Sequence, residues 1–139
     1  MLLIHSVLRW IVVILGIVTI VVLALGWLRK KPWTQLDTRL SMAFSIAMDV
    51  QILIGLILLI WAGLNGAGFP RERLEHAFMM VLALVAVHVP MRWKGAPDAK
   101  RFRNTLIAYV LAILIVILGV ALLPGGGWGR MFPPPFSLP

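Results

Sequence analysis

The chain has 139 residues, of which 61% are hydrophobic and 13% are charged, and its formal net charge is +8. This composition excludes an ordinary soluble domain and is typical of a polytopic membrane protein. The absence of cysteine excludes disulfides, thiolate-ligated iron–sulfur clusters and a covalently attached c-type haem. The basic residues lie in two short loops beside apolar segments, which indicates contact with lipid head groups and no nucleic-acid partner.

Four apolar segments are each long enough to cross a bilayer as a helix. They predict one transmembrane domain over residues 1–139 and leave no room for a soluble catalytic module. The first segment is too long for the apolar part of a signal peptide and runs into a basic stretch, so we expect it to be retained. The predicted spans cover residues 2–28, 40–62, 74–91 and 105–123, followed by a Pro/Gly-rich tail over 124–139.

The loops predict the topology. Residues 63–70 contain three glycines, an asparagine and a proline, which is typical of a turn. Residues 29–39 and 92–103 are strongly basic, whereas acidic and basic residues balance in the loop between them. The positive-inside rule therefore predicts an all-α protein with four helices in an up-down-up-down bundle and both termini outside.

Two histidines fall at matching depth in this topology. Spans one and three both enter from the outer side, and at 1.5 Å per residue His5 and His76 each lie roughly one turn inside it. These two spans are diagonal neighbours in an up-down bundle. Two facing imidazoles are axial ligands for a b-type haem, so His5 and His76 are predicted to bind its iron. The alternative is that each histidine is an interfacial residue with a solvated tip.

Cationic side chains near these histidines suit haem propionates. Arg9 lies one helical turn from His5 on the same face, and Arg71 and Arg73 precede His76 at the outer mouth. Arginine makes the better bidentate contact with a carboxylate. The sequence therefore predicts Arg9, Arg71 and Arg73 as cofactor-binding residues. Glu75 and Ser6 are candidates to orient the imidazole N–H groups.

A second polar level lies nearer the inner side. Asp49 on span two and His88 on span three fall at similar depth. Ionisable residues inside spans are costly in lipid and often functional. Asp49 and His88 are therefore a candidate proton-relay or quinone contact, and the alternative is a buried ion pair that joins two helices.

Four short runs in this chain resemble a family of small bacterial four-helix membrane proteins loosely labelled cytochrome b-like. The resemblance implies a multi-pass protein of the bacterial inner (cytoplasmic) membrane, with His5, His76 and Arg9 as its functional residues. That family often has histidine where this chain has Asp49, so no ligand from span two is expected here. The runs are His5-Ser6-Val7-Leu8-Arg9-Trp10, Lys30-Lys31-Pro32-Trp33, Gln51-Ile52-Leu53-Ile54-Gly55-Leu56 and Glu75-His76-Ala77-Phe78-Met79-Met80.

Two functions remain open from the sequence. The first is a b-type haem protein in electron transfer, with non-covalent haem b near the outer face between helices one and three and a quinone as a partner. The second is a non-catalytic accessory subunit of a larger respiratory or photosynthetic membrane complex. Its expected partners are the other subunits of that complex or further copies of the same chain. The small size and the Pro/Gly-rich tail favour the second, and the paired histidines favour the first.

Overall fold

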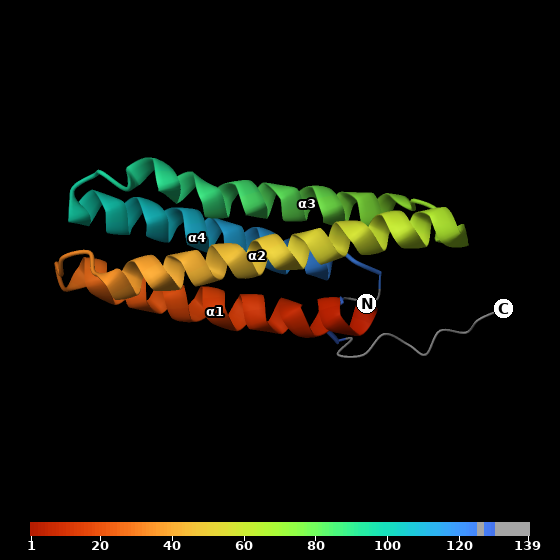
Figure 1. Ribbon diagram of the computed structural model, residues 1–139, viewed down its shortest axis with the longest axis horizontal. Helices are drawn as coiled ribbons and strands as arrows, with labels where there is room; N and C mark the ends of the chain where they lie inside the picture. Colours follow the sequence, from red (N-terminus) through yellow and green to blue (C-terminus); the bar gives the residue numbers. More distant parts are fainter. Residues whose placement is uncertain (125–126, 130–139) are drawn as a thin grey trace.

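The computed structural model describes residues 1–124 and 127–129, and these contain four long helices and no strand. The helices lie side by side along the long axis of the molecule (Figure 1). Each is long and apolar enough to cross a membrane. Their bounds are α1 Leu2–Leu28, α2 Gln35–Ala62, α3 Arg71–His88 and α4 Asp98–Ala121.

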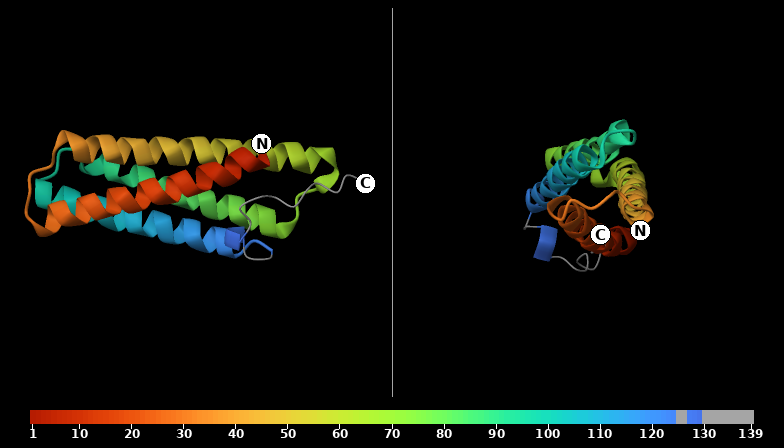
Figure 2. Two further views of the ribbon diagram at one scale, coloured as in Figure 1. Left: turned by 90° about the horizontal axis from the view of Figure 1, so that it is seen from below. Right: turned by 90° about the vertical axis from the view of Figure 1, so that its left-hand side faces the viewer.

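The two ends of the bundle differ in which connections they carry. The α1–α2 and α3–α4 connections lie together at one end, here called the basic end because residues 29–31 and 94 are basic. The N-terminus and the α2–α3 connection lie toward the other end, here called the N-terminal end (Figures 1 and 2). Within the described residues, α1 packs against α2 and α4, α3 packs against the same two helices, and α1 does not touch α3. Thus α1 and α3 occupy opposite corners.

Helix α2 begins five residues before the predicted span. The Thr34 backbone N–H and hydroxyl both donate to the Asp37 carboxylate, at 2.8 and 2.9 Å, which closes a capping box. Asp37 and Arg39, predicted to lie in a loop, are therefore helical. Similarly, α4 begins at Asp98 directly after Pro97 and includes most of the basic stretch. At the start of both α2 and α4, backbone hydrogen bonds extend the helix beyond its apolar residues.

The predicted turn over residues 63–70 is confirmed, although the helical conformation extends slightly into it. The chain leaves that conformation at Asn65 (φ −98°, ψ 33°), whose side-chain amide donates to the Trp61 carbonyl at 2.7 Å. The reversal comes from Gly66 and Gly68, whose φ values are 99° and 63°. A glycine reaches this left-handed region without the clash that a β-carbon causes.

Phe44, Met48 and Phe102 are almost completely buried between the basic end and the middle of the bundle, and a β-carbon on Gly26 would lie 2.6 Å from Cε1 of Phe102. On α4, fully buried residues continue to Val120, near the N-terminal end. By contrast, the first ten residues of α1 and the first twelve of α3 include no fully buried residue. The N-terminal end of the bundle is therefore more loosely packed along these two helices.

Candidate functional site

The predicted histidine ligands lie on opposite helices toward the N-terminal end. His5 belongs to the first turns of α1 and His76 to the second turn of α3. The two imidazoles are close enough for their charges to interact, and Arg9 lies within the same range of both. The structure thus brings together His5, Arg9 and His76, although His5 and His76 are 71 positions apart in the sequence. The expected diagonal relationship between their helices holds.

His76 is oriented by the backbone of α4. Its Nδ1 atom lies 2.8 Å from the carbonyl oxygen of Gly119. Because a carbonyl oxygen only accepts, Nδ1 must carry the proton and donate. In the neutral ring, Nε2 then keeps its lone pair, which is the tautomer that a metal-binding histidine needs.

His5 points the Cε1 edge of its ring at the backbone of α2. A β-carbon on Gly55 would meet the ring at 2.9 Å from Cε1, so the ring occupies the space that any other side chain would fill. The Gln51 amide nitrogen donates to the His5 carbonyl oxygen at 3.0 Å and lies 3.4 Å from Nε2. His5 Nδ1 and Gln51 Oε1 are buried without a hydrogen-bond partner in the described part of the chain. A buried nitrogen of this kind is an available ligand atom.

The surroundings of the two histidines are only half-buried. Ser6, Arg9 and Trp10 on α1 and Ala77 and Met80 on α3 are neither fully buried nor fully exposed. In a closely packed bundle, the inward face of each helix is buried by its neighbours. These residues therefore lie at the edge of the packed interior, with part of each side chain covered by its neighbours.

Arg9 is engaged in a different contact from the predicted one. Its Nη1 atom donates to the Gly127 carbonyl oxygen at 3.0 Å. The guanidinium also lies 5.7 Å from the Trp10 ring centroid and 5.3 Å from that of Trp128. Trp128 in turn donates from Nε1 to the Ile117 carbonyl at 3.1 Å. Arg9 therefore holds the start of the C-terminal tail against α1 and α4, and the rest of the tail, residues 130–139, lies outside the described residues.

The other predicted cofactor-binding arginines lie on the surface. Arg71 Nε is 2.6 Å from Glu75 Oε1, and 89% of the Arg71 side chain is exposed. Glu75 was expected to orient an imidazole, but it forms this ion pair one turn along α3 instead. Arg73 is also exposed. Both arginines border the mouth of the bundle without lining its interior.

The donor set favours some cofactors over others. The described residues include no group of three or more His, Cys, Asp or Glu side chains that could hold a metal ion. Zinc and non-haem iron sites ordinarily draw three or more ligands from the protein. A porphyrin supplies four ring nitrogens itself and requires only one or two side chains. The Nε2 atom of His76 and the unpartnered Nδ1 atom of His5 are therefore donor atoms of the kind that a haem requires.

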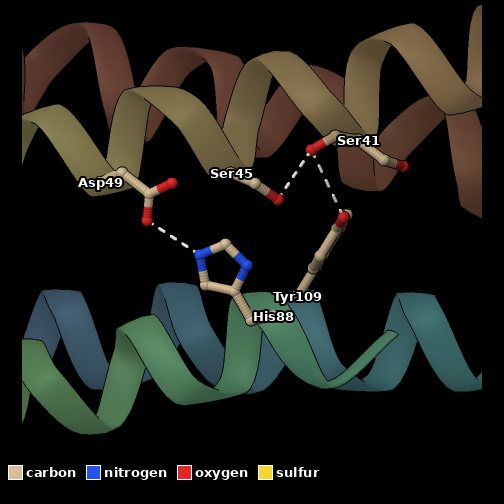
Figure 3. Close-up of polar contacts among 5 residues, drawn as sticks. All are labelled: Ser41, Ser45, Asp49, His88 and Tyr109. Carbon is tan, nitrogen blue, oxygen red and sulfur yellow. Dashed lines mark hydrogen bonds and ion pairs between the residues drawn. The ribbon is translucent and has the colours of Figure 1, made fainter. Parts of the chain in front are cut away.

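A second polar cluster lies between α2 and α3. His88 Nε2 is 2.8 Å from Asp49 Oδ1, so the predicted pairing of these two residues is confirmed. The pair joins α2 and α3 as the alternative of a polar clasp expected, but it is not buried, because 47% of the Asp49 side chain and 40% of the His88 side chain are exposed. Figure 3 shows the two side chains meeting across the space between the helices, beside Ser45 and Tyr109.

Three features of the site were not predicted from the sequence. They are the Gln51 contact with His5, the Gly119 carbonyl that accepts from His76, and the stacking of Trp128 on Arg9. The only sequence signal for the Gln51 contact was an amide inside an apolar span, one helical turn from Gly55 on α2. The other two depend on helix rotation and on chain beyond α4.

Comparison with known proteins gives no assignment. No family model matches the chain, and neither a curated protein nor a solved structure shows significant similarity to it.

Proposed function

We propose that this chain is a membrane protein that binds a b-type haem and takes part in electron transfer. The haem would lie between α1 and α3 with His5 and His76 as axial ligands. The observation that carries this proposal is the tautomer of His76, whose Nδ1 bond to Gly119 leaves Nε2 as a ligand atom. Support comes from His5 on the helix at the opposite corner, whose Nδ1 is buried without a hydrogen-bond partner among the described residues.

The residues of the chain have separate roles in this proposal. Gly119 fixes the ring plane of His76, and Gly55 and Gln51 hold the His5 ring against α2. Positioning of this kind raises ligand basicity and limits ring rotation. When bound, the haem would supply a reversible one-electron redox centre. The half-buried faces of α1 and α3 would provide its apolar surroundings.

Propionate binding falls to the arginines around the site. Arg9 is the nearest cation to the two histidines, and it already donates to the Gly127 carbonyl. A guanidinium presents its N–H donors in a planar fork that matches the geometry of a carboxylate. Arg71 and Arg73 lie farther out on α3 and would receive a propionate that extends toward the surface.

We infer that the chain lies in the bacterial inner membrane as an up-down-up-down bundle. The concentration of basic residues at one end of the molecule supports this orientation under the positive-inside rule. The basic end would face the cytoplasm, and both termini and the histidine pair would lie toward the outer face.

The decisive experiment is a visible spectrum of the purified chain in mild detergent, first oxidised and then reduced with dithionite. We expect a sharp reduced α band typical of bis-imidazole haem, and its loss in His5→Ala and in His76→Ala. His88→Ala is the matched control, because it removes a histidine outside the site and should keep the band. A colourless wild type after expression with added haem precursor would refute the proposal and favour the accessory-subunit function.

A further inference from the structure

The surface where α2 meets α3 presents polar side chains among otherwise apolar ones. Ser41, Ser45 and Asp49 follow one another at four-residue spacing, so they share one face of α2. His88 reaches this face from α3 and Tyr109 from α4 (Figure 3). Ser45 donates to the Ser41 carbonyl at 2.9 Å, and the Tyr109 hydroxyl lies 3.5 Å from the same oxygen. Of these side chains, only Asp49 and His88 are substantially exposed.

The pair lies well inside the apolar part of the bundle. Asp49 is ten residues beyond the exposed Arg39, which is about 15 Å along a helix. His88 precedes Trp93 by five residues, mostly in a 3-10 turn, which is about 10 Å. The hydrocarbon layer is about 30 Å thick, so both measures place the pair within it. Phospholipid head groups would not reach this depth.

The exposed neighbours of the pair are apolar. Ile46 and Leu53 on α2 and Val85 on α3 are each more than half exposed. Polar and ionisable groups that face lipid are costly, and a chain that retains them on such a surface usually uses them. The open half of the Asp49–His88 pair therefore requires a polar partner that is itself dissolved in the membrane.

The free atoms of the pair define the chemistry of that partner. The bond between His88 Nε2 and Asp49 Oδ1 leaves His88 Nδ1 and Asp49 Oδ2, and neither is joined to another drawn residue in Figure 3. The carboxylate oxygen accepts hydrogen bonds, and the imidazole nitrogen accepts or donates according to its protonation. Such a set suits a neutral headgroup whose oxygens alternate between hydroxyl and carbonyl. It disfavours an anionic headgroup, which the Asp49 carboxylate would repel.

We propose that the exposed Asp49–His88 pair between α2 and α3 binds the headgroup of a membrane-dissolved quinone or quinol, with both residues as hydrogen-bonding partners. The ligand's apolar tail would lie along the exposed aliphatic side chains of α2 and α3. This site rests on the proposed electron-transfer function for its biological meaning, because a quinone is an electron carrier. Its binding requires no haem, so the two proposals can be tested apart.

The test is photolabelling of the full chain in lipid nanodiscs with an azido-substituted benzoquinone that carries an alkyl tail. Mass spectrometry identifies the labelled peptides, and competition by a decyl-tailed benzoquinone gives an apparent affinity. We expect labels on α2 and α3 near Asp49 and His88, and at least a tenfold weaker affinity in Asp49→Ala and His88→Ala. Asp49→Asn keeps an acceptor oxygen and should retain most of the binding.

Matched controls separate this site from general partition into lipid. Ile14→Ala trims an equally exposed apolar residue on α1, away from the pair, and should leave the affinity unchanged. A decyl-tailed benzene without ring oxygens should not compete. Equal affinity in the wild type and in His88→Ala, or labels mainly on α1 and α4, would overturn the proposal. A wild-type dimer that His88→Ala converts to a monomer would also overturn it, because a second copy would then cover the Asp49–His88 pair.

One further variant distinguishes the two proposals. His5→Ala should lose the haem band but keep quinone labelling at α2 and α3. A colourless wild type that still shows the tenfold effect of His88→Ala would refute the proposed haem while leaving the quinone site standing. A coloured wild type whose quinone affinity does not change in His88→Ala would refute the quinone site and leave the proposed haem standing.

Discussion

The imidazole of His5 occupies the space over Gly55 that a β-carbon would take. The hypothetical β-carbon lies 2.9 Å from Cε1, 3.6 Å from Nδ1 and 3.7 Å from Nε2. The ring therefore rests on the α2 backbone, and Gly55 is the residue that allows it. His76 has a similar neighbour in Gly119, whose carbonyl accepts its Nδ1 hydrogen. Each histidine is thus positioned by a glycine of an adjacent helix.

Gly55→Ala should displace the His5 ring without removing a ligand. A contact of 2.9 Å is too short for two carbon atoms, so the imidazole must move away from α2. We expect the chain to fold and to bind haem at least several-fold more weakly than the wild type, as followed by haem titration in detergent. Gly95→Ala, where a β-carbon meets no atom within 4 Å, is the control. Unchanged haem affinity in Gly55→Ala would contradict this role for the glycine.

Gly26→Ala should destabilise the basic end. Its β-carbon would lie 2.6 Å from Cε1 and 2.8 Å from Cζ of Phe102, a ring that is 1% exposed and packed against Trp33 at 4.9 Å between centroids. Overpacking of this kind typically costs about 1–3 kcal/mol. Unfolding by a denaturing detergent, followed by circular dichroism, measures the loss. A stability equal to that of Gly95→Ala would mean that Phe102 moves aside freely.

Arg9→Met should release the start of the tail. The substitution keeps an apolar stem but removes the charged donor to the Gly127 carbonyl and the cation over Trp128. A hydrogen bond from a charged group contributes about 1.5–3 kcal/mol. We expect amide hydrogen exchange in residues 127–129 to become at least tenfold faster, whereas Arg29→Met at an exposed position should leave it unchanged. Equal exchange in both variants would show that Trp128 alone holds the segment through its bond to Ile117.

The membrane orientation can be tested because the chain has no cysteine. Ala67→Cys lies exposed in the α2–α3 connection, and Gly95→Cys lies exposed between α3 and α4. A membrane-impermeant maleimide should label Ala67→Cys in spheroplasts of an expressing bacterium and should label Gly95→Cys only after lysis. The opposite pattern would invert the topology and place the histidine pair near the cytoplasm.

The sequence predicted the elements better than their ends. Leu2–Leu28 matches the predicted first span because its C-terminal end coincides with the change from apolar to basic residues at Arg29. Asp37, Arg39 and Arg101 were misplaced because helical hydrogen bonding continues past the lipid-compatible part of a chain. Arg101 even stacks on Trp33 from its helical position, at 4.0 Å from the ring centroid. Hydropathy reports burial in lipid, not where backbone hydrogen bonds end.

The candidate site was predictable at the level of residue types and depth, but not at the level of contacts. The rise per residue placed His5 and His76 toward the same end and on opposite helices. Which backbone atom meets which ring depends on how each helix rotates about its axis, and the pattern of apolar residues on lipid-facing helices fixes that rotation poorly. The Arg71–Glu75 pair, by contrast, follows directly from four-residue spacing within one helix.

The placement of the two histidines on helices that do not touch has a consequence for biogenesis. His5 emerges from the ribosome 71 residues ahead of His76, which at roughly 5–20 residues per second is a delay of about 4–14 s. During that interval the first hairpin, α1 and α2, carries only one of the two histidines of the proposed haem site. A cofactor that bridges the two imidazoles can bind only after the third helix has inserted. Cofactor loading would therefore be a late step of membrane integration.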